Sequence, residues 1–129
     1  MIEKALREEF ERLMDNAERI WQTTYDTHDL EPYLLAILKF LKKNLDSKDL
    51  LEQYMVELVQ KPRWRVSLDV IEFCMFELRW SKVKKAAEDL VAYTQEVQDV
   101  RRRDVVWKIP LAFSDDWDGA EFYDYYSKK

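Results

Sequence analysis

The most apolar part of the chain spans residues 63–80 and reads RWRVSLDVIEFCMFELRW. On an α-helix, its apolar residues would cover most of the circumference and leave only a narrow polar strip, formed by Arg65, Asp69, Glu72 and Arg79. A helix that is apolar on nearly every side must be covered by neighbouring elements. We therefore expect a helix from about Arg63 to about Arg79 at the centre of the fold.

Other segments have apolar residues at the spacings of three and four that are typical of amphipathic helices. They predict helices over Ile2 to about Thr23, Tyr33 to about Asn44, Lys48 to about Gln60 and Lys82 to about Gln98, with a sixth helical stretch over about Asp99 to Phe113. The sixth stretch contains Pro110, which removes a backbone hydrogen bond, so we expect it to be kinked or split.

The boundaries of these helices are predicted from turn and cap residues. The residues Tyr25–Glu31 favour a loop that contains His28, and Pro32 then suits the first turn of the second helix. The pair Asp46–Ser47 supplies cap chemistry before the third helix, and Ser81 is the expected N-cap of the fifth.

The composition limits the fold class. The chain has 129 residues, which is the usual size of one domain, but it has a single glycine. Tight hairpins and phosphate-binding loops depend on glycine, so β-barrels, Rossmann folds and P-loops are poor candidates. We predict one all-α domain over residues 1–129, with five or six helices arranged as an antiparallel bundle or a short HEAT-like α-solenoid. Residues 114–129 form an acidic and aromatic C-terminal segment.

The charge balance and the single cysteine indicate a class of partner and a compartment. With 26 acidic and 21 basic side chains the net charge is −5, which disfavours nucleic acid and anionic membranes and favours a basic protein partner. Cys74 lies in an apolar run, so we expect a buried thiol and a reducing compartment. The charge-rich start of the chain does not resemble a signal peptide, and no apolar stretch is long enough to span a membrane. We therefore expect a cytoplasmic protein.

Side chains that usually perform chemistry are scarce. His28 is the only imidazole and has no cysteine or second histidine at ligand spacing, so we expect a solvated or capping role, with no metal and no cofactor. A buried Cys74 and one loop histidine do not provide a nucleophile with a positioned base. Basic clusters at Lys61–Arg65 and Arg101–Arg103 lie among acidic residues, and we expect them to pair with carboxylates rather than bind nucleic acid. We predict that the chain is not an enzyme.

The C-terminal segment is the most unusual part of the sequence. Between Ser114 and Ser127 it has five acidic and five aromatic residues and no basic residue. Protein interfaces are rich in tryptophan and tyrosine, and carboxylates steer the approach of a basic partner. The segment therefore predicts a partner-binding surface formed by Asp115, Asp116, Trp117, Asp118, Glu121, Tyr123 and Asp124.

Two alternatives stay open for this surface. In the first, the acidic residues face water while three aromatic side chains fold back onto the helical core: Trp117, Phe122 and Tyr125. In the second, the partner binds the acidic outer face of the first helix, around Glu8, Glu11, Asp15 and Glu18.

Three stretches resemble small helical bacterial immunity proteins that are encoded beside polymorphic toxins, including those of contact-dependent growth inhibition systems. They are Arg63–Trp80, Ser81–Lys84 and Ala112–Trp117, and the resemblance covers roughly Pro32 to Tyr126. It implies a cytoplasmic protein that binds its cognate toxin domain, frequently a nuclease, and blocks its active site or substrate groove. We expect the toxin domain to be basic and the chain to be a monomer that forms a one-to-one complex with it. The alternative function is a helical scaffold or adaptor without a toxin partner.

Overall fold

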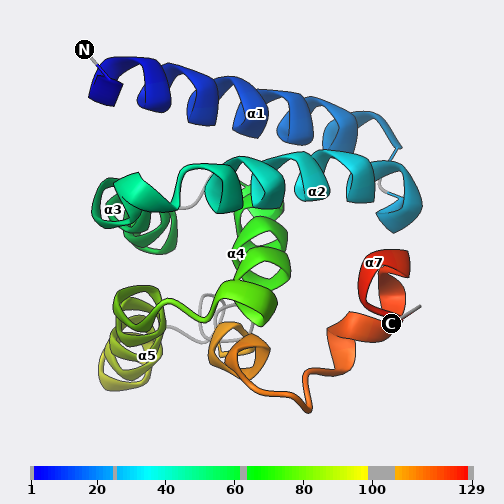
Figure 1. Cartoon of the computed structure of the whole chain (residues 1–129). Coiled ribbons are helices and arrows are strands. Elements are labelled where there is room, and N and C mark those ends of the chain that lie inside the picture. The colour runs from blue at the N-terminus through cyan, green and yellow to red at the C-terminus, as the bar shows by residue number, and fades with distance from the viewer. Residues whose placement is uncertain (1, 25, 62–63, 99–106, 128–129) are drawn as a thin grey trace.

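A computed structural model describes residues 2–24, 26–61, 64–98 and 107–127. Within these ranges every regular element is a helix and there is no β-strand, which confirms the all-α prediction. The elements in chain order are α1 (Ile2–Thr24), α2 (Thr27–Lys43), η1 (Leu45–Ser47), α3 (Lys48–Gln60), α4 (Trp64–Leu78), α5 (Ser81–Glu96), η2 (Ile109–Phe113), η3 (Asp118–Phe122) and α7 (Asp124–Ser127) (Figure 1). No helix of the described ranges is both long and apolar enough to cross a membrane.

Helix α4 lies at the centre of the fold, as its apolar circumference predicts. It packs against α1, α2, α3 and η2. Seven of its described side chains have no exposed surface: Val66, Ser67, Val70, Ile71, Phe73, Cys74 and Met75. Burial of each large apolar side chain of this kind stabilises the fold by about 1.5–3 kcal/mol relative to exposure.

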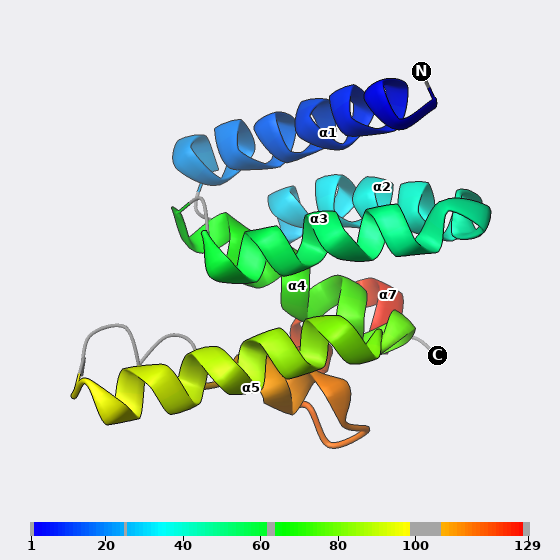
Figure 2. The same ribbon diagram turned by 90° about the vertical axis from the view of Figure 1, so that its left-hand side faces the viewer.

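The other long helices lie around α4 in several directions. Helices α1 and α2 run antiparallel, and Figure 2 shows them as successive layers on one side of α4. Helices α3 and α5 pack against each other and are seen almost end-on in Figure 1, where α4 stands upright. The helices therefore do not share the common axis of an antiparallel bundle.

The N-terminal hairpin is held by the apolar face of α1. Phe10, Met14 and Ala17 of this helix are buried. The Phe10 ring centroid lies 6.5 Å from that of Phe40 on α2 and 5.5 Å from that of Tyr54 on α3. Phe10 thus contacts two helices. The apolar face of α1 that was predicted from residue spacing is therefore the face that packs against the rest of the fold.

The start of α2 differs from the prediction, whereas α3 spans the predicted Lys48–Gln60. Residues 27–31 are helical, so His28 lies in a helical turn and the predicted loop is wrong. The helix begins early because the Asp26 side chain caps it: its Oδ1 accepts a hydrogen bond from the His28 backbone N–H at 2.8 Å. Pro32 consequently lies inside the helix, where its missing N–H costs one intrahelical hydrogen bond.

The start of α5 is also satisfied differently from the prediction. Ser81 is the first helical residue, and the N-cap is Trp80. The backbone N–H of Lys82 donates instead to Oε2 of Glu52 at 2.9 Å, and this α3 side chain is only 3% exposed. A carboxylate at a helix N-terminus is favoured by the unpaired N–H groups and the helix dipole, which explains why a glutamate can be buried there.

The stretch predicted as a sixth helix lies partly outside the described residues, at positions 99–106. Its described end is the 3₁₀-helix η2, in which Pro110 is the second residue and its missing N–H needs no helical partner. Helix η2 packs against α4 and α5. The chain then continues through η3 to α7, which lies beside the start of α2 (Figure 1).

Candidate functional site

The C-terminal segment folds back onto α4 through its aromatic rings. The ring centroid of Trp117 lies 5.1 Å from that of Phe76, and Tyr123 meets Phe73 edge-on at 4.9 Å. Trp117 and Tyr123 are both buried, which confirms that Trp117 packs on the core. The same expectation is wrong for Phe122, which is 63% exposed, while Tyr125 is half-buried.

The only glycine of the chain serves this packing. A Cβ atom at Gly119 would come within 2.6 Å of Trp117 ring atoms, closer than real Cβ contacts occur. The backbone of Gly119 has no positive φ, so close approach to the indole, not an unusual turn, explains the glycine.

A buried glutamate fixes the end of the segment to α2. Glu31 is 8% exposed, and its two carboxylate oxygens accept the backbone N–H groups of Asp124 at 3.0 Å and Tyr125 at 2.8 Å. It thereby caps α7 from another helix, as Glu52 caps α5. The Tyr125 hydroxyl also donates to Oε1 of Glu77 at 2.9 Å, so the segment is tethered to both α2 and α4.

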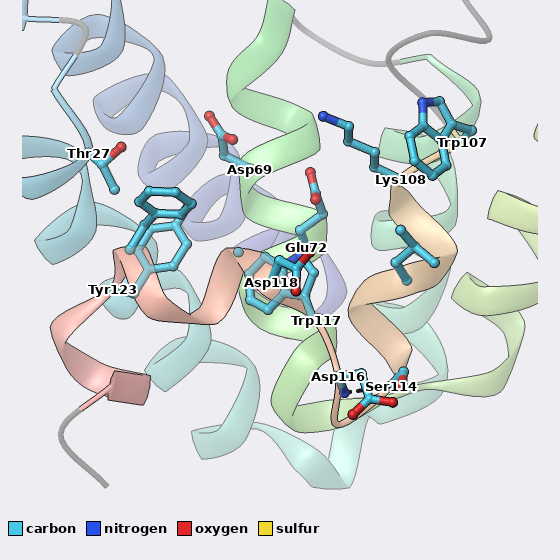
Figure 3. Close-up of a pocket in the computed structure, with 13 residues that line it drawn as sticks. Thr27, Asp69, Glu72, Trp107, Lys108, Ser114, Asp116, Trp117, Asp118 and Tyr123 are labelled. Atoms are coloured by element: carbon cyan, nitrogen blue, oxygen red, sulfur yellow. Dashed lines mark hydrogen bonds between the residues drawn. The ribbon is translucent and has the colours of Figure 1, made fainter.

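A cleft of about 450 Å³ lies between α4, η2 and the C-terminal segment (Figure 3). This volume is in the range of small-molecule or side-chain binding sites. Its lining residues come from α2, α4, the η2 region and the segment: Thr27, Asp69, Glu72, Trp107, Lys108, Leu111, Ser114, Asp116, Trp117, Asp118, Gly119, Phe122 and Tyr123.

The cleft is acidic and aromatic. Its carboxylates are Asp69 and Glu72 of α4 together with Asp116 and Asp118 of the segment, and Lys108 is the only basic side chain among the described residues that line it. Figure 3 shows Asp69 and Glu72 projecting from α4 between Tyr123 on one side and Lys108 on the other. Such a cleft suits a cationic group of a ligand or partner, because the carboxylates attract its charge and the rings cover its apolar part.

Apolar side chains at the edge of the cleft remain exposed. Phe122, Leu111 and Trp107 each line it and each keep close to half or more of their surface in water. Large apolar side chains gathered beside an acidic cleft are typical of a surface that meets another protein.

The structure brings together four of the seven predicted partner-binding residues, namely Asp116, Trp117, Asp118 and Tyr123. Because Trp117 and Tyr123 are buried, they form part of the cleft wall and are not projecting anchors. Glu121 is exposed and lies outside the cleft lining.

The remaining two acids have intramolecular contacts. Asp115 accepts a hydrogen bond from the Arg79 guanidinium at 2.5 Å. Asp124 begins α7 and has one carboxylate oxygen 4.0 Å from Nδ1 of His28. Sequence reasoning missed Asp69 and Glu72 as members of the site, although the polar strip of the central helix was a signal for them.

The alternative acidic surface, on α1, is interleaved with basic side chains. Glu11 lies 3.3 Å from Nε of Arg7, and Oε1 of Glu9 lies 2.5 Å from Arg12. Arg7 also pairs with Glu57 of α3 at 2.6 Å. These contacts cancel much of the negative charge of this face.

Burial suppresses ionisation in the core beneath the cleft. It raises the pKa of the Cys74 thiol and of the Tyr123 hydroxyl far above their ordinary values, and nearby carboxylates raise both further. Cys74 is buried, as predicted, and its neutral thiol is a core side chain rather than a nucleophile.

Comparisons with known proteins found no match for this chain. No family model matches the chain, and no curated protein or solved structure shows significant similarity to it.

Proposed function

We propose that this protein is an immunity protein that binds and neutralises a toxin domain, with the acidic and aromatic cleft as its binding surface. The single observation that carries the proposal is the cleft composition: its described lining has four carboxylates and one lysine beside exposed aromatic and aliphatic side chains. The resemblance to toxin immunity proteins supplies the class of partner.

In the proposed mechanism, the cleft surface imitates nucleic acid and covers the active site or substrate groove of the toxin. A nuclease presents lysine, arginine and histidine to the phosphodiester, so a rigid group of carboxylates can occupy the same field. Complementary charges of this kind raise the association rate, and desolvated pairs slow dissociation. An immunity protein must leave almost no free toxin, so we expect a dissociation constant of about 1 nM or below, or about −12 kcal/mol.

The cleft can meet these requirements because the backbone that carries two of its acidic residues is held in place by the buried residue between them. Asp116 and Asp118 flank Trp117, whose indole is fixed between Phe76 and Gly119. A preorganised surface loses little conformational entropy on binding, which favours high affinity.

The test is co-expression with the protein encoded immediately upstream, scored by growth rescue and co-purification. We expect this neighbour to be toxic alone and the two chains to form a stable one-to-one complex in the cytoplasm. The double variant D116K/D118K should weaken binding about 100-fold, or about 2.7 kcal/mol, because it puts positive charge opposite a basic partner. Asp115 is left unchanged because its reversal would also break the Arg79 pair.

The matched control is E88K/E96K, which changes the net charge equally at two exposed positions of α5. It should bind like the unmodified chain. Equal weakening of toxin binding by both variants would show that only the net charge matters. If the partner binds the acidic face of α1 instead, the E8K/E18K variant should weaken binding and D116K/D118K should not. A harmless neighbour, or no complex, would overturn the proposal in favour of a scaffold or adaptor.

A further inference from the structure

Three metal-ligating side chains come together where the C-terminal segment meets α2. His28, Glu31 and Asp124 each offer one donor atom, and these atoms all lie within 4.8 Å of one another. His28 and Glu31 are three residues apart on α2, so they lie on one face of the helix. Asp124 belongs to α7, which lies beside this end of α2 (Figure 1).

We propose that these three side chains bind a divalent metal ion, and that zinc fits them best. One imidazole nitrogen and two carboxylate oxygens are a donor set that zinc accepts, with a water molecule as the fourth ligand. The proposal concerns a site apart from the acidic cleft and does not depend on the proposed function.

The distances are compatible with one shared ion after a small movement. Two ligands of a tetrahedral zinc ion lie about 3.4 Å apart, since each bond measures about 2.0–2.2 Å. Nδ1 of His28 lies 4.0 Å from Oδ2 of Asp124. Both side chains are largely exposed, so they can rotate inward by about 1 Å without disturbing the core.

Glu31 gives the cluster a fixed ligand. Its carboxylate is buried and is oriented by the backbone N–H groups of Asp124 and Tyr125. Each carboxylate oxygen accepts one of these hydrogen bonds and has a second lone pair that can face an ion. Outer-shell hydrogen bonds of this kind orient ligands in metal sites.

Metal binding here would join α2 to α7. It would add a link between segments that are more than ninety residues apart, at the point where Glu31 already holds the C-terminal segment. Because zinc would bind the folded chain and not the unfolded one, the free energy of unfolding should rise with the logarithm of the zinc concentration above the dissociation constant.

The site can be tested with zinc ions and the untagged full chain. We expect calorimetry to give one zinc per chain and NMR to show a shift of the imidazole nitrogens, which belong to a single histidine and need no assignment. His28→Ala should weaken zinc binding at least about tenfold because only carboxylates remain. Asp124→Asn keeps the backbone N–H that Glu31 accepts and should also weaken binding.

The matched control is Glu121→Gln, which removes an exposed carboxylate from the same segment but outside the cluster. It should bind zinc as tightly as the unmodified chain. Zinc affinity that is unchanged in a folded His28→Ala chain, or imidazole signals that do not shift at about 1 mM zinc, would overturn the proposal.

Discussion

The outer face of α1 and the C-terminal segment are both rich in acidic residues, but the two regions differ in which of these residues have basic partners. On α1, Glu9 and Glu11 have arginine partners within one helical turn. Among the described residues, Asp116 and Asp118 have no ion-pair partner. Acidic content alone therefore does not identify a binding surface, because the field depends on whether basic side chains are interleaved.

The two regions also differ in what holds them. Helix α1 is a continuous helix of 23 residues with its own backbone hydrogen bonds. The C-terminal segment has only short helices, so its conformation depends on rings packed against α4 and on the carboxylate of Glu31. Perturbations of tertiary contacts should therefore affect the segment far more than the α1 surface.

The largest effect should come from Glu31→Ala, which removes the acceptor of two backbone N–H groups. We expect a loss of about 3 kcal/mol in the free energy of unfolding, because each hydrogen bond to a charged group contributes about 1.5–3 kcal/mol. Urea denaturation with a chelator present measures it, and hydrogen exchange should show faster exchange over residues 114–127 than over α1. Glu8→Ala, which removes only an exposed contact with Lys4 at 4.0 Å, is the control and should cost less than about 0.5 kcal/mol.

A smaller loss of stability is expected from Gly119→Ala. This variant tests the packing of the C-terminal segment separately from its charge, because it leaves every charge in place. The new methyl group must displace the Trp117 indole, and we expect destabilisation of about 2 kcal/mol, typical of overpacking. Thermal unfolding measures it, with Ala120→Ser in the same 3₁₀-helix as the control. A stability equal to that of the unmodified chain would mean that the indole is not held against this backbone.

The smallest loss of stability is expected from removing a hydrogen bond that joins α1 to α3. Tyr54 donates its hydroxyl to the Glu3 carbonyl at 3.3 Å, and burial raises its pKa above the ordinary value of 10.0. The unfolded chain therefore loses this proton first as the pH rises, so stability should fall above about pH 10, by at most about 1.4 kcal/mol per pH unit. Tyr54→Phe should cost about 1 kcal/mol at neutral pH and reduce this alkaline loss in urea titrations. An alkaline slope that is unchanged in the variant would contradict the assignment.

Local patterns in the sequence were sufficient for most of the fold. The spacing of apolar residues predicted the class and the central helix, because both depend on neighbours three or four positions away along one helix. The predicted start of α2 is wrong because proline favours the first turn of a helix, whereas here the side-chain hydrogen bond of Asp26 begins the helix before Pro32.

The candidate site could be predicted only in part. The sequence indicated the acidic and aromatic character of the C-terminal segment but not that Asp69 and Glu72 of α4 join it. Likewise, nothing near His28 in the chain indicated that Asp124 lies beside it. The two residues are close where Glu31 accepts hydrogen bonds from the backbone of α7. Contacts over such separations follow from tertiary packing, which spacing along one helix does not encode.

The burial of Cys74 makes the chain a convenient background for site-specific labelling. We expect its fully covered thiol not to react with a maleimide while the chain is folded, because the reagent cannot reach it and burial disfavours the reactive thiolate. A cysteine placed at exposed Phe122, beside the cleft, would then be the one thiol available to a dye. A fluorophore at that position could report in real time on anything that enters the cleft.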